Sequence, residues 1–130
     1  MAGRAVICLD TNYLILGLVS ESSEAEELIS WSRTGETFCT PSTAWYEFLC
    51  GPVNAKQVST MKGVLQRILP FDDRQAQEAA RLYNATGRKR RLRVDAMIAA
   101  AATTHRIPLA TGNHDDFAEF VPLGLTLALP

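Results

Sequence analysis

The stretch that most constrains the fold of this chain is a short apolar run that ends in an acid, residues 5–12 (AVICLDTN). Its β-branched and other apolar residues predict a buried parallel strand, and Asp10 stands where that strand would end. Ligands of open α/β sheets bind beyond the carboxyl ends of the strands, so Asp10 is a candidate for the functional site. The alternative is that Asp10, assisted by Asn12, caps a helix that starts near Thr11.

Composition and charge narrow the class of protein. The chain has 130 residues, 47% of them hydrophobic, which is enough for one core, and we expect residues 1–130 to form a single domain. The formal charge of −1 indicates neither a nucleic-acid nor a membrane partner. The charges are unevenly placed, however, because residues 74–106 hold eight basic and two acidic residues and residues 1–47 hold two basic and seven acidic ones. A basic flank beside an acidic patch could hold a polyanion near bound cations.

The cysteines and the absence of targeting patterns indicate a cytoplasmic protein without a membrane partner. Three cysteines without CxxC spacing lie in apolar or aromatic surroundings, which predicts reduced core thiols: Cys8, Cys39 and Cys50. No stretch approaches the roughly eighteen apolar residues of a membrane span, and the first residues lack the layout of a secretory signal. His105 and His114 form no helical ligand pair, which argues against zinc.

Hydrophobic periodicity predicts strands and helices in alternation, and therefore an α/β fold. We expect helices at about 13–19, 22–31, 42–50, 54–68, 72–84 and 94–104, and further strands at 37–39, 69–71, 109–110 and 125–129. In the second helix, Leu28 and Ile29 are expected to face inward. Pro70 is expected to place its strand at an edge of the sheet.

Carboxylates recur where a strand ends or a helix faces the sheet. Glu47 lies on the margin of the apolar stripe of its helix, and Asp95 heads the apolar face of the helix at 94–104. Asp115 and Asp116 follow the strand at 109–110 and the turn after it. Each acid also has a simpler explanation, with Glu47 as a surface residue and Asp95 as a helix cap.

Taken with Asp10, these acids predict one acidic cleft, because βαβ units bring the ends of strands together. Clustered carboxylates repel one another, so such a cleft favours a cation, and hard oxygen ligands favour Mg²⁺ or Mn²⁺ over zinc or copper. A metal held by carboxylates beside a basic flank indicates phosphodiester hydrolysis. The basic run at 87–93 (GRKRRLR) is then either a segment that contacts phosphates or a solvated connector.

Four motifs of this chain resemble those of the PIN-domain ribonucleases, and most closely those of the VapC-type toxins of bacterial toxin–antitoxin pairs. The motifs are LDTN at 9–12, STAWYEFLCG at 42–51, VDAMIAAAA at 94–102 and LATGNHDDF at 109–117. The resemblance implies a PIN-like three-layer fold with a five-stranded parallel sheet in the order 3-2-1-4-5. It also implies Mg²⁺- or Mn²⁺-dependent cleavage of single-stranded or looped RNA, a cognate antitoxin that occupies the cleft, and a homodimer.

The resemblance also assigns residues by position. Asp10, Glu47 and Asp95 match the first three acids of the family, and Asp116, which just precedes the phenylalanine, matches the fourth. Asp10 and Asp95 are expected to ligate the metal, and Asp116 to hold a second ion or to order water around the first. Glu47 is expected to orient or deprotonate the attacking water. The expected substrate-binding residues are Thr11, Asn12, Thr111, Asn113, Arg88, Arg90 and Arg91.

Three other functions are consistent with parts of this pattern. A non-catalytic PIN-like module would bind RNA or a protein, and its binding would survive loss of metal. A phosphoryl acceptor of the response-regulator type would need a lysine at the end of a late strand, where this chain has residues 111–113 (TGN). A nuclease that cleaves DNA would use the same metal chemistry.

Overall fold

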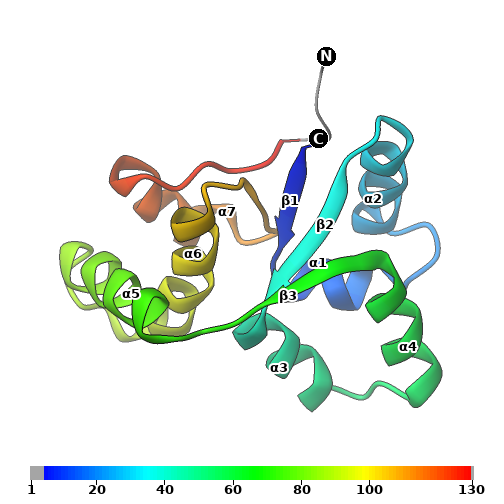
Figure 1. Ribbon diagram of the computed structural model, residues 1–130, viewed down its shortest axis with the longest axis horizontal. Helices are drawn as coiled ribbons and strands as arrows, with labels where there is room; N and C mark the ends of the chain where they lie inside the picture. The colour runs from blue at the N-terminus through cyan, green and yellow to red at the C-terminus, as the bar shows by residue number, and fades with distance from the viewer. Residues whose placement is uncertain (1–4, 130) are drawn as a thin grey trace.

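A parallel sheet lies between two layers of helices in the computed structural model, which describes residues 5–129 (Figure 1). Its strands are β1 (Val6–Leu9), β2 (Thr37–Pro41), β3 (Leu65–Leu69) and β4 (Leu109–Ala110), in the order β3-β2-β1-β4. The predicted α/β class and three-layer fold are therefore confirmed. β3 lies at an edge of the sheet, but the strand predicted over 69–71 is wrong in its bounds, because β3 ends at Leu69 and Pro70 follows it. The helices are α1 (Thr11–Leu16), α2 (Ser23–Arg33), α3 (Ser42–Cys50), α4 (Ala55–Val64), α5 (Asp73–Ala85), α6 (Arg93–His105) and α7 (His114–Phe117), with 3₁₀ helices η1 (Arg90–Leu92) and η2 (Ala118–Leu123).

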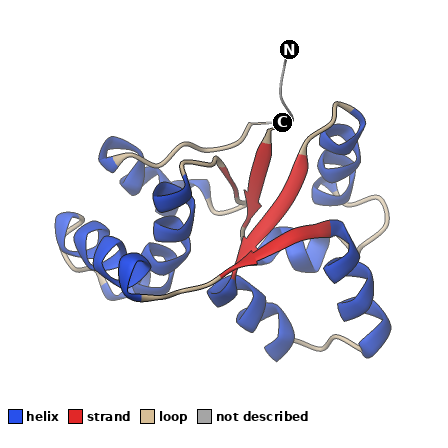
Figure 2. Cartoon of the chain, viewed as in Figure 1, coloured by secondary structure: helices blue, strands red, loops and turns tan. Residues whose placement is uncertain are grey.

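The predicted count of five strands is wrong, because the described chain forms four (Figure 2). The predicted last strand, residues 125–129, does lie beside β4, but it forms only an isolated parallel bridge between Leu109 and Leu127. The backbone N–H of Leu109 donates to Thr126 O, and the N–H of Ala128 donates to Leu109 O. β4 is only two residues long, so it has too few backbone groups to pair with residues 125–129 as a full strand.

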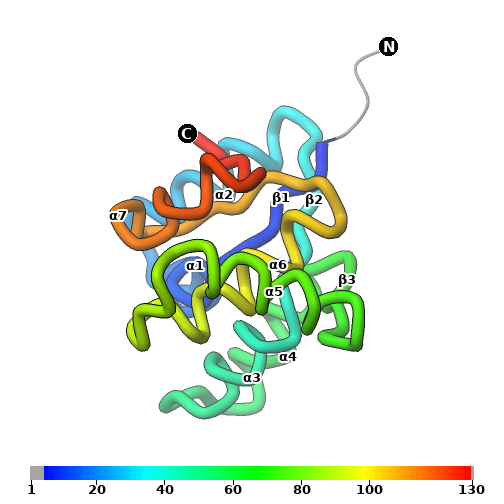
Figure 3. The backbone as a smooth tube through the Cα atoms, turned by 90° about the vertical axis from the view of Figure 1, so that its left-hand side faces the viewer, coloured from blue at the N-terminus to red at the C-terminus, as the bar shows by residue number. Residues whose placement is uncertain are grey.

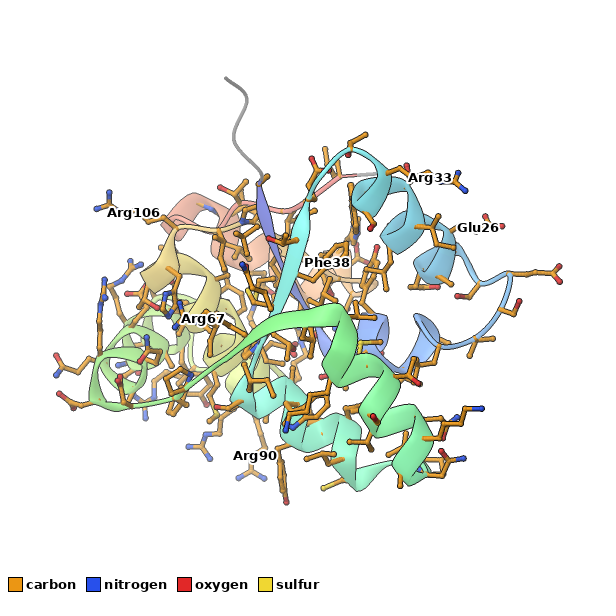
Figure 4. All side chains as sticks on the ribbon, turned by 45° about the vertical axis from the view of Figure 1, so that its right-hand side comes forward. Glu26, Arg33, Phe38, Arg67, Arg90 and Arg106 are labelled. Atoms are coloured by element: carbon orange, nitrogen blue, oxygen red, sulfur yellow. The ribbon has the colours of Figure 1, made fainter. Side chains whose placement is uncertain are left out.

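The central strands β1 and β2 are buried on both faces, as the near-continuous apolar run of β1 requires, whereas Gln66 and Arg67 of the edge strand β3 are exposed. Phe38 faces the layer of α1, α2 and α4, where its ring lies 6.4 Å from that of Trp31 (Figure 4). Cys39, the next residue of β2, faces the opposite layer, in which α5 and α6 pack against each other (Figure 3). This layering leaves the carboxyl ends of β1 and β4 beside α1, α3, α6 and α7.

The helix predicted over residues 54–68 is wrong in its last part, because α4 ends at Val64 and β3 follows at once. The register along β2 shifts between Phe38, which pairs with Leu65, and Cys39, which pairs with Arg67. The extra residue of this bulge puts Leu65 and Ile68 on the same face of the sheet. Their spacing of three residues therefore imitates a helical period.

Two predictions about single side chains are also wrong. Leu28 is buried in α2 as expected, but the neighbouring Ile29 is 51% exposed, because only one of two adjacent helical residues reaches the sheet. Cys8 and Cys39 are buried free thiols as expected, whereas Cys50, also predicted to lie in the core, is exposed at the end of α3.

The predicted cap of α2 is confirmed, because the hydroxyl of Ser22 accepts from Ala25 N at 2.9 Å.

Candidate functional site

Four elements bring the predicted acids to one end of the sheet. Asp10 directly follows β1, Glu47 lies on α3, Asp95 lies in the first turn of α6, and Asp116 lies on α7. Thr111 follows β4 directly and faces Asp10. α3 packs against α1 and α6, and α6 packs against α7, so residues distant in the sequence meet beyond the strand ends.

Asp10 is both a helix cap and a member of this site. Its Oδ1 accepts a hydrogen bond of 2.7 Å from Thr11 N, which makes Asp10 the N-cap of α1. Its Oδ2 accepts a hydrogen bond of 2.7 Å from the Thr111 hydroxyl. Burial raises the pKa of the Asp10 carboxyl, and the hydrogen bonds from Thr111 and Thr11 counter part of that rise. The side chain is therefore fixed at both oxygens by neighbouring elements.

Glu47 is exposed, yet it is tied to the site through Thr11. The Thr11 hydroxyl donates to Glu47 Oε1 at 2.7 Å, which joins α3 to α1. The charge of Glu47 also contributes to the raised pKa of Asp10. On the same helix, α3, the rings of Trp45 and the fully buried Phe48 pack with their centroids 5.2 Å apart, and Glu47 lies between these two residues in the sequence. This packing fixes the helix face on which Glu47 stands.

Asp116 has partners at both carboxylate oxygens. Asn113 Nδ2 donates to Asp116 Oδ2 at 3.0 Å, and Arg91 Nη1 donates to Asp116 Oδ1. Asn113 N in turn donates to the Thr111 hydroxyl at 2.9 Å. One hydrogen-bonded chain thus runs from Asp10 through Thr111 and Asn113 to Asp116.

Asp95 differs from the other acids, because within residues 5–129 its carboxylate takes part in no hydrogen bond or ion pair. It is not the cap of α6, since the N-cap is Leu92 and provides no side-chain hydrogen bond. The capping alternative for Asp95 is therefore wrong. Burial is the first cause that raises the pKa of Asp95 to about 6. The negative charges of nearby acids add to it, in the order Asp10, Asp116 and Glu47.

Comparisons with known proteins agree with this geometry. The model of the PIN domain matches residues 7–121. The chain belongs to the PIN-domain family. The resemblance drawn from the four motifs is thereby confirmed. No protein of curated function matches the chain by sequence.

Several solved structures share the fold of this PIN domain. A toxin–antitoxin complex from Klebsiella pneumoniae is 25% identical with a TM-score of 0.69, over 86% of this chain and 90% of that one. FitAcB from Neisseria gonorrhoeae is 22% identical with a TM-score of 0.72, over 95% and 97% of the two chains. VapBC2 from Rickettsia felis, bound to a DNA fragment from its promoter, is 16% identical with a TM-score of 0.71, over 95% and 97%. These neighbours are consistent with a VapC-type PIN toxin.

The acids of this PIN domain fit a divalent cation by their chemistry. In the described part of the chain, no three His, Cys, Asp or Glu side chains are already drawn together as a metal-binding group. The carboxylates are nevertheless close enough to raise the pKa of Asp95, and among residues 5–129 no side chain or backbone group donates to the Asp95 oxygens. Hard oxygen donors that repel one another suit Mg²⁺ or Mn²⁺, both of which keep several waters as ligands. Asp10 and Asp95 are the residues that would ligate such an ion.

Only part of the basic run faces this site. Arg88 turns back to α5, where Nη1 donates to Asn84 Oδ1 at 2.7 Å. Arg90 is exposed and points outward (Figure 4). Arg91 alone reaches the acids. The run is thus neither a continuous phosphate-binding surface nor a fully solvated connector.

Glu119, a residue of η2 at the margin of the site, could not be recognised from the sequence. Its Oε1 accepts from Lys89 at 2.7 Å, and its Oε2 accepts from Arg91 Nη2 at 2.8 Å. These partners are 28 to 30 residues away along the chain. Glu119 lies outside the motifs of the family, and no periodic pattern marks it.

No helix among residues 5–129 has the length and apolarity that a membrane crossing needs.

The raised pKa of Asp95 predicts a pH-dependent stability. In the metal-free protein this group binds its proton more tightly when folded than when unfolded. The free energy of unfolding should therefore fall as pH rises from about 4 to about 6. Because Asp95 is partly exposed, we expect this loss to be only about 1 kcal/mol.

Urea unfolding at pH 4 and pH 7 in chelator measures this effect. Asp95→Asn should gain about 1 kcal/mol relative to the wild-type protein between the two pH values. Asp115→Asn, which changes an exposed acid next to Asp116, should follow the wild-type profile. A wild-type and an Asp95→Asn profile that run parallel would contradict the prediction.

Proposed function

We propose that this PIN domain is a Mg²⁺- or Mn²⁺-dependent endoribonuclease that cleaves single-stranded or looped RNA, and that it is the toxin of a toxin–antitoxin pair in the cytoplasm. The observation that carries the proposal is the meeting of Asp10, Glu47, Asp95 and Asp116 beyond the strand ends, although they come from four separate elements. A cluster of acids in which the pKa values of Asp10 and Asp95 are raised is unfavourable for folding unless it has a use. Phosphodiester hydrolysis at a divalent ion is such a use.

The roles of the acids follow from their surroundings. Asp10 and Asp95 would hold the ion, because hydrogen bonds from Thr11 and Thr111 orient Asp10, and Asp95, in the first turn of α6, accepts from no residue among 5–129. When bound, a divalent ion lowers the pKa of water and stabilises negative charge on the phosphate. Glu47 is the exposed acid, so it is placed to take a proton from the attacking water. Asn113 and Arg91 hold the Asp116 carboxylate in place, and its role would be to order the water around the ion.

The polar residues around the acids divide into two roles. The hydroxyls of Thr11 and Thr111 donate to Glu47 and Asp10, so we assign them to positioning the acids. Asn12, beside Gly112 at the margin of the site, and the outward-pointing Arg90 are better placed to contact RNA. Arginine binds phosphate through a fork of N–H donors, and single-stranded RNA offers its phosphates freely.

Exposed apolar side chains support the proposal of protein partners. A cavity of about 340 Å³ lies between α1, α2, α4 and β2, with Leu28, Phe38 and Met61 in its wall and Arg33 at its margin. Ile15, on α1, is 41% exposed. An amphipathic segment of a cognate antitoxin could bury this surface. The toxin–antitoxin complex from Klebsiella pneumoniae among the structural neighbours supports the same partner.

A second apolar surface supports a homodimer. Tyr46 and Leu49 of α3 are 68% and 45% exposed, on the side of the helix away from Phe48. Large aromatic and aliphatic side chains exposed together are typical of protein interfaces. We therefore propose α3 as part of the contact between two copies.

Cleavage of a labelled single-stranded RNA with and without divalent ions tests the proposal. We expect cleavage in Mn²⁺ or Mg²⁺, at least about a hundredfold slower cleavage in chelator, and recovery when the ion is returned. A single-stranded DNA of the same sequence, run in parallel, tests the choice of backbone. RNA binding without any cleavage in either ion would favour the non-catalytic module, and undiminished cleavage in chelator would refute the metal mechanism.

A further inference from the structure

Arg91 places a positive charge of the chain's own within the acidic site. Its Nη1 donates to Asp116 Oδ1, and its Nη2 donates to Glu119 Oε2 at 2.8 Å. The guanidinium therefore spans two carboxylates, one on α7 and one on η2. Its charge also acts on Asp95, whose pKa it lowers against the effect of the other acids.

The Arg91 guanidinium is held in place from several directions. Glu119, which accepts from Arg91, is itself paired with Lys89 at 2.7 Å, so the arrangement is a network of charges. Arg91 also lies on η1, which leads directly into α6 and thus to Asp95. An isolated ion pair at this exposure would contribute little, but a forked guanidinium within a network keeps a fixed geometry. The positive charge is thus a constant feature of the site.

Asp116 and Asp95 differ in what they can offer to a cation. Asp116 and Asp10 both accept from protein donors at both oxygens, but one donor to Asp116 is the cationic Arg91, whereas both donors to Asp10 are neutral. Asp95 accepts from none of the described residues and is raised in pKa by its neighbours. A divalent ion at Asp116 would have to displace the guanidinium or lie beside it, and both are unfavourable. An ion at Asp95 has no guanidinium to displace, because Arg91 acts on Asp95 through its charge and forms no hydrogen bond with it.

We propose that Arg91 takes the place of a second cation at Asp116, so that the site binds a single divalent ion, held by Asp10 and Asp95. This inference rests on the proposed function, because it concerns the metal of the same site. Arg91 is then a positioning residue that acts through Asp116, and its part in substrate binding is secondary. The weakly hydrated guanidinium of Arg91 neutralises the charge of Asp116. Its rigid fork of N–H donors also keeps the Asp116 carboxylate in one orientation.

Calorimetric titration with Mn²⁺ in the absence of RNA tests the number of ions. The wild-type chain should bind a single ion. Arg91→Gln should bind a second, with about tenfold tighter binding of Mn²⁺ at Asp116 than in the wild-type chain. Arg91→Lys keeps a positive charge at this position and should restore binding of a single ion. Arg93→Gln removes a positive charge of the same basic run that lies over the Tyr83 ring and pairs with no acid among residues 5–129, and it should bind Mn²⁺ as the wild-type chain does.

The outcomes separate this inference from the proposed function. A second ion bound by the wild-type chain, or a single ion bound unchanged by Arg91→Gln, would overturn the role of Arg91 and leave the metal site at Asp10 and Asp95 intact. Weaker binding in Arg91→Gln would overturn it too, because Arg91 would then support the metal site and not compete with it. No ion bound by the wild-type chain would overturn the proposed function itself. Thermal unfolding of each metal-free variant verifies that the fold is retained.

Discussion

Asp95→Asn should lower the rate of RNA cleavage by at least about a thousandfold, a loss of about 4 kcal/mol of transition-state stabilisation. The amide has the size of the carboxylate but lacks its charge, so it binds a divalent ion far more weakly. The substitution should not unfold the chain, because at neutral pH it removes repulsion from Asp10, Asp116 and Glu47. Single-turnover cleavage of a labelled RNA in saturating Mn²⁺ measures the effect.

Asp115→Asn is the matched control for this experiment. Asp115 neighbours Asp116 on α7 but is exposed, and it contacts none of the other acids through a hydrogen bond in the described chain. Its substitution should change the cleavage rate less than about threefold, as is usual for surface residues. Equal rates for Asp95→Asn and Asp115→Asn would show that position 95 does not take part in the chemistry.

Asp10 and Asp95 could be predicted from the sequence because each stands at or near a boundary between elements, whereas Glu47, inside α3, was predicted from its place at the margin of an apolar stripe. Asp10 follows a run of apolar residues that can only be a buried strand, and Asp95 heads a helix face of small apolar residues. The boundary of a strand or helix can be recognised from the residues around it. Parallel strands then place their carboxyl ends at the same edge of the sheet, which brings these residues together. The role of each acid, like the single domain over residues 1–130, stays a prediction.

The arrangement around the acids could not be predicted in this way. Arg91 and Glu119 are 28 residues apart, and their ion pair depends on how η1 and η2 lie against α6 and α7. The start of β3 was missed for a similar reason, since a bulge opposite β2 gives Leu65 and Ile68 the spacing of a helix. Side-chain partners and register are tertiary properties, and local periodicity does not contain them.

Thr111→Val should reduce cleavage by about 10- to 100-fold and destabilise the fold by about 1–3 kcal/mol. Thr111 is 2% exposed, so its hydroxyl has no water to replace its partners. The hydroxyl donates to Asp10 Oδ2 and accepts from Asn113 N, and valine can do neither. Asp10 loses the hydrogen bond that orients it, and Asn113 N–H loses its acceptor. Cleavage rates and urea unfolding of the same variant measure the two effects.

Thr111→Ser separates the hydroxyl from the shape of the side chain. Serine keeps both hydrogen bonds and loses one methyl group, so it should retain most of the activity even if it unfolds about 1 kcal/mol more easily. Valine keeps the shape and loses the hydrogen bonds, so its activity should fall further than its stability alone explains. The reverse order, with Thr111→Val active and Thr111→Ser inactive, would mean that packing at the end of β4 positions Asp10. Because Asp10 depends on this bond across the sheet, the geometry of the acids is set as much by neutral side chains as by charge.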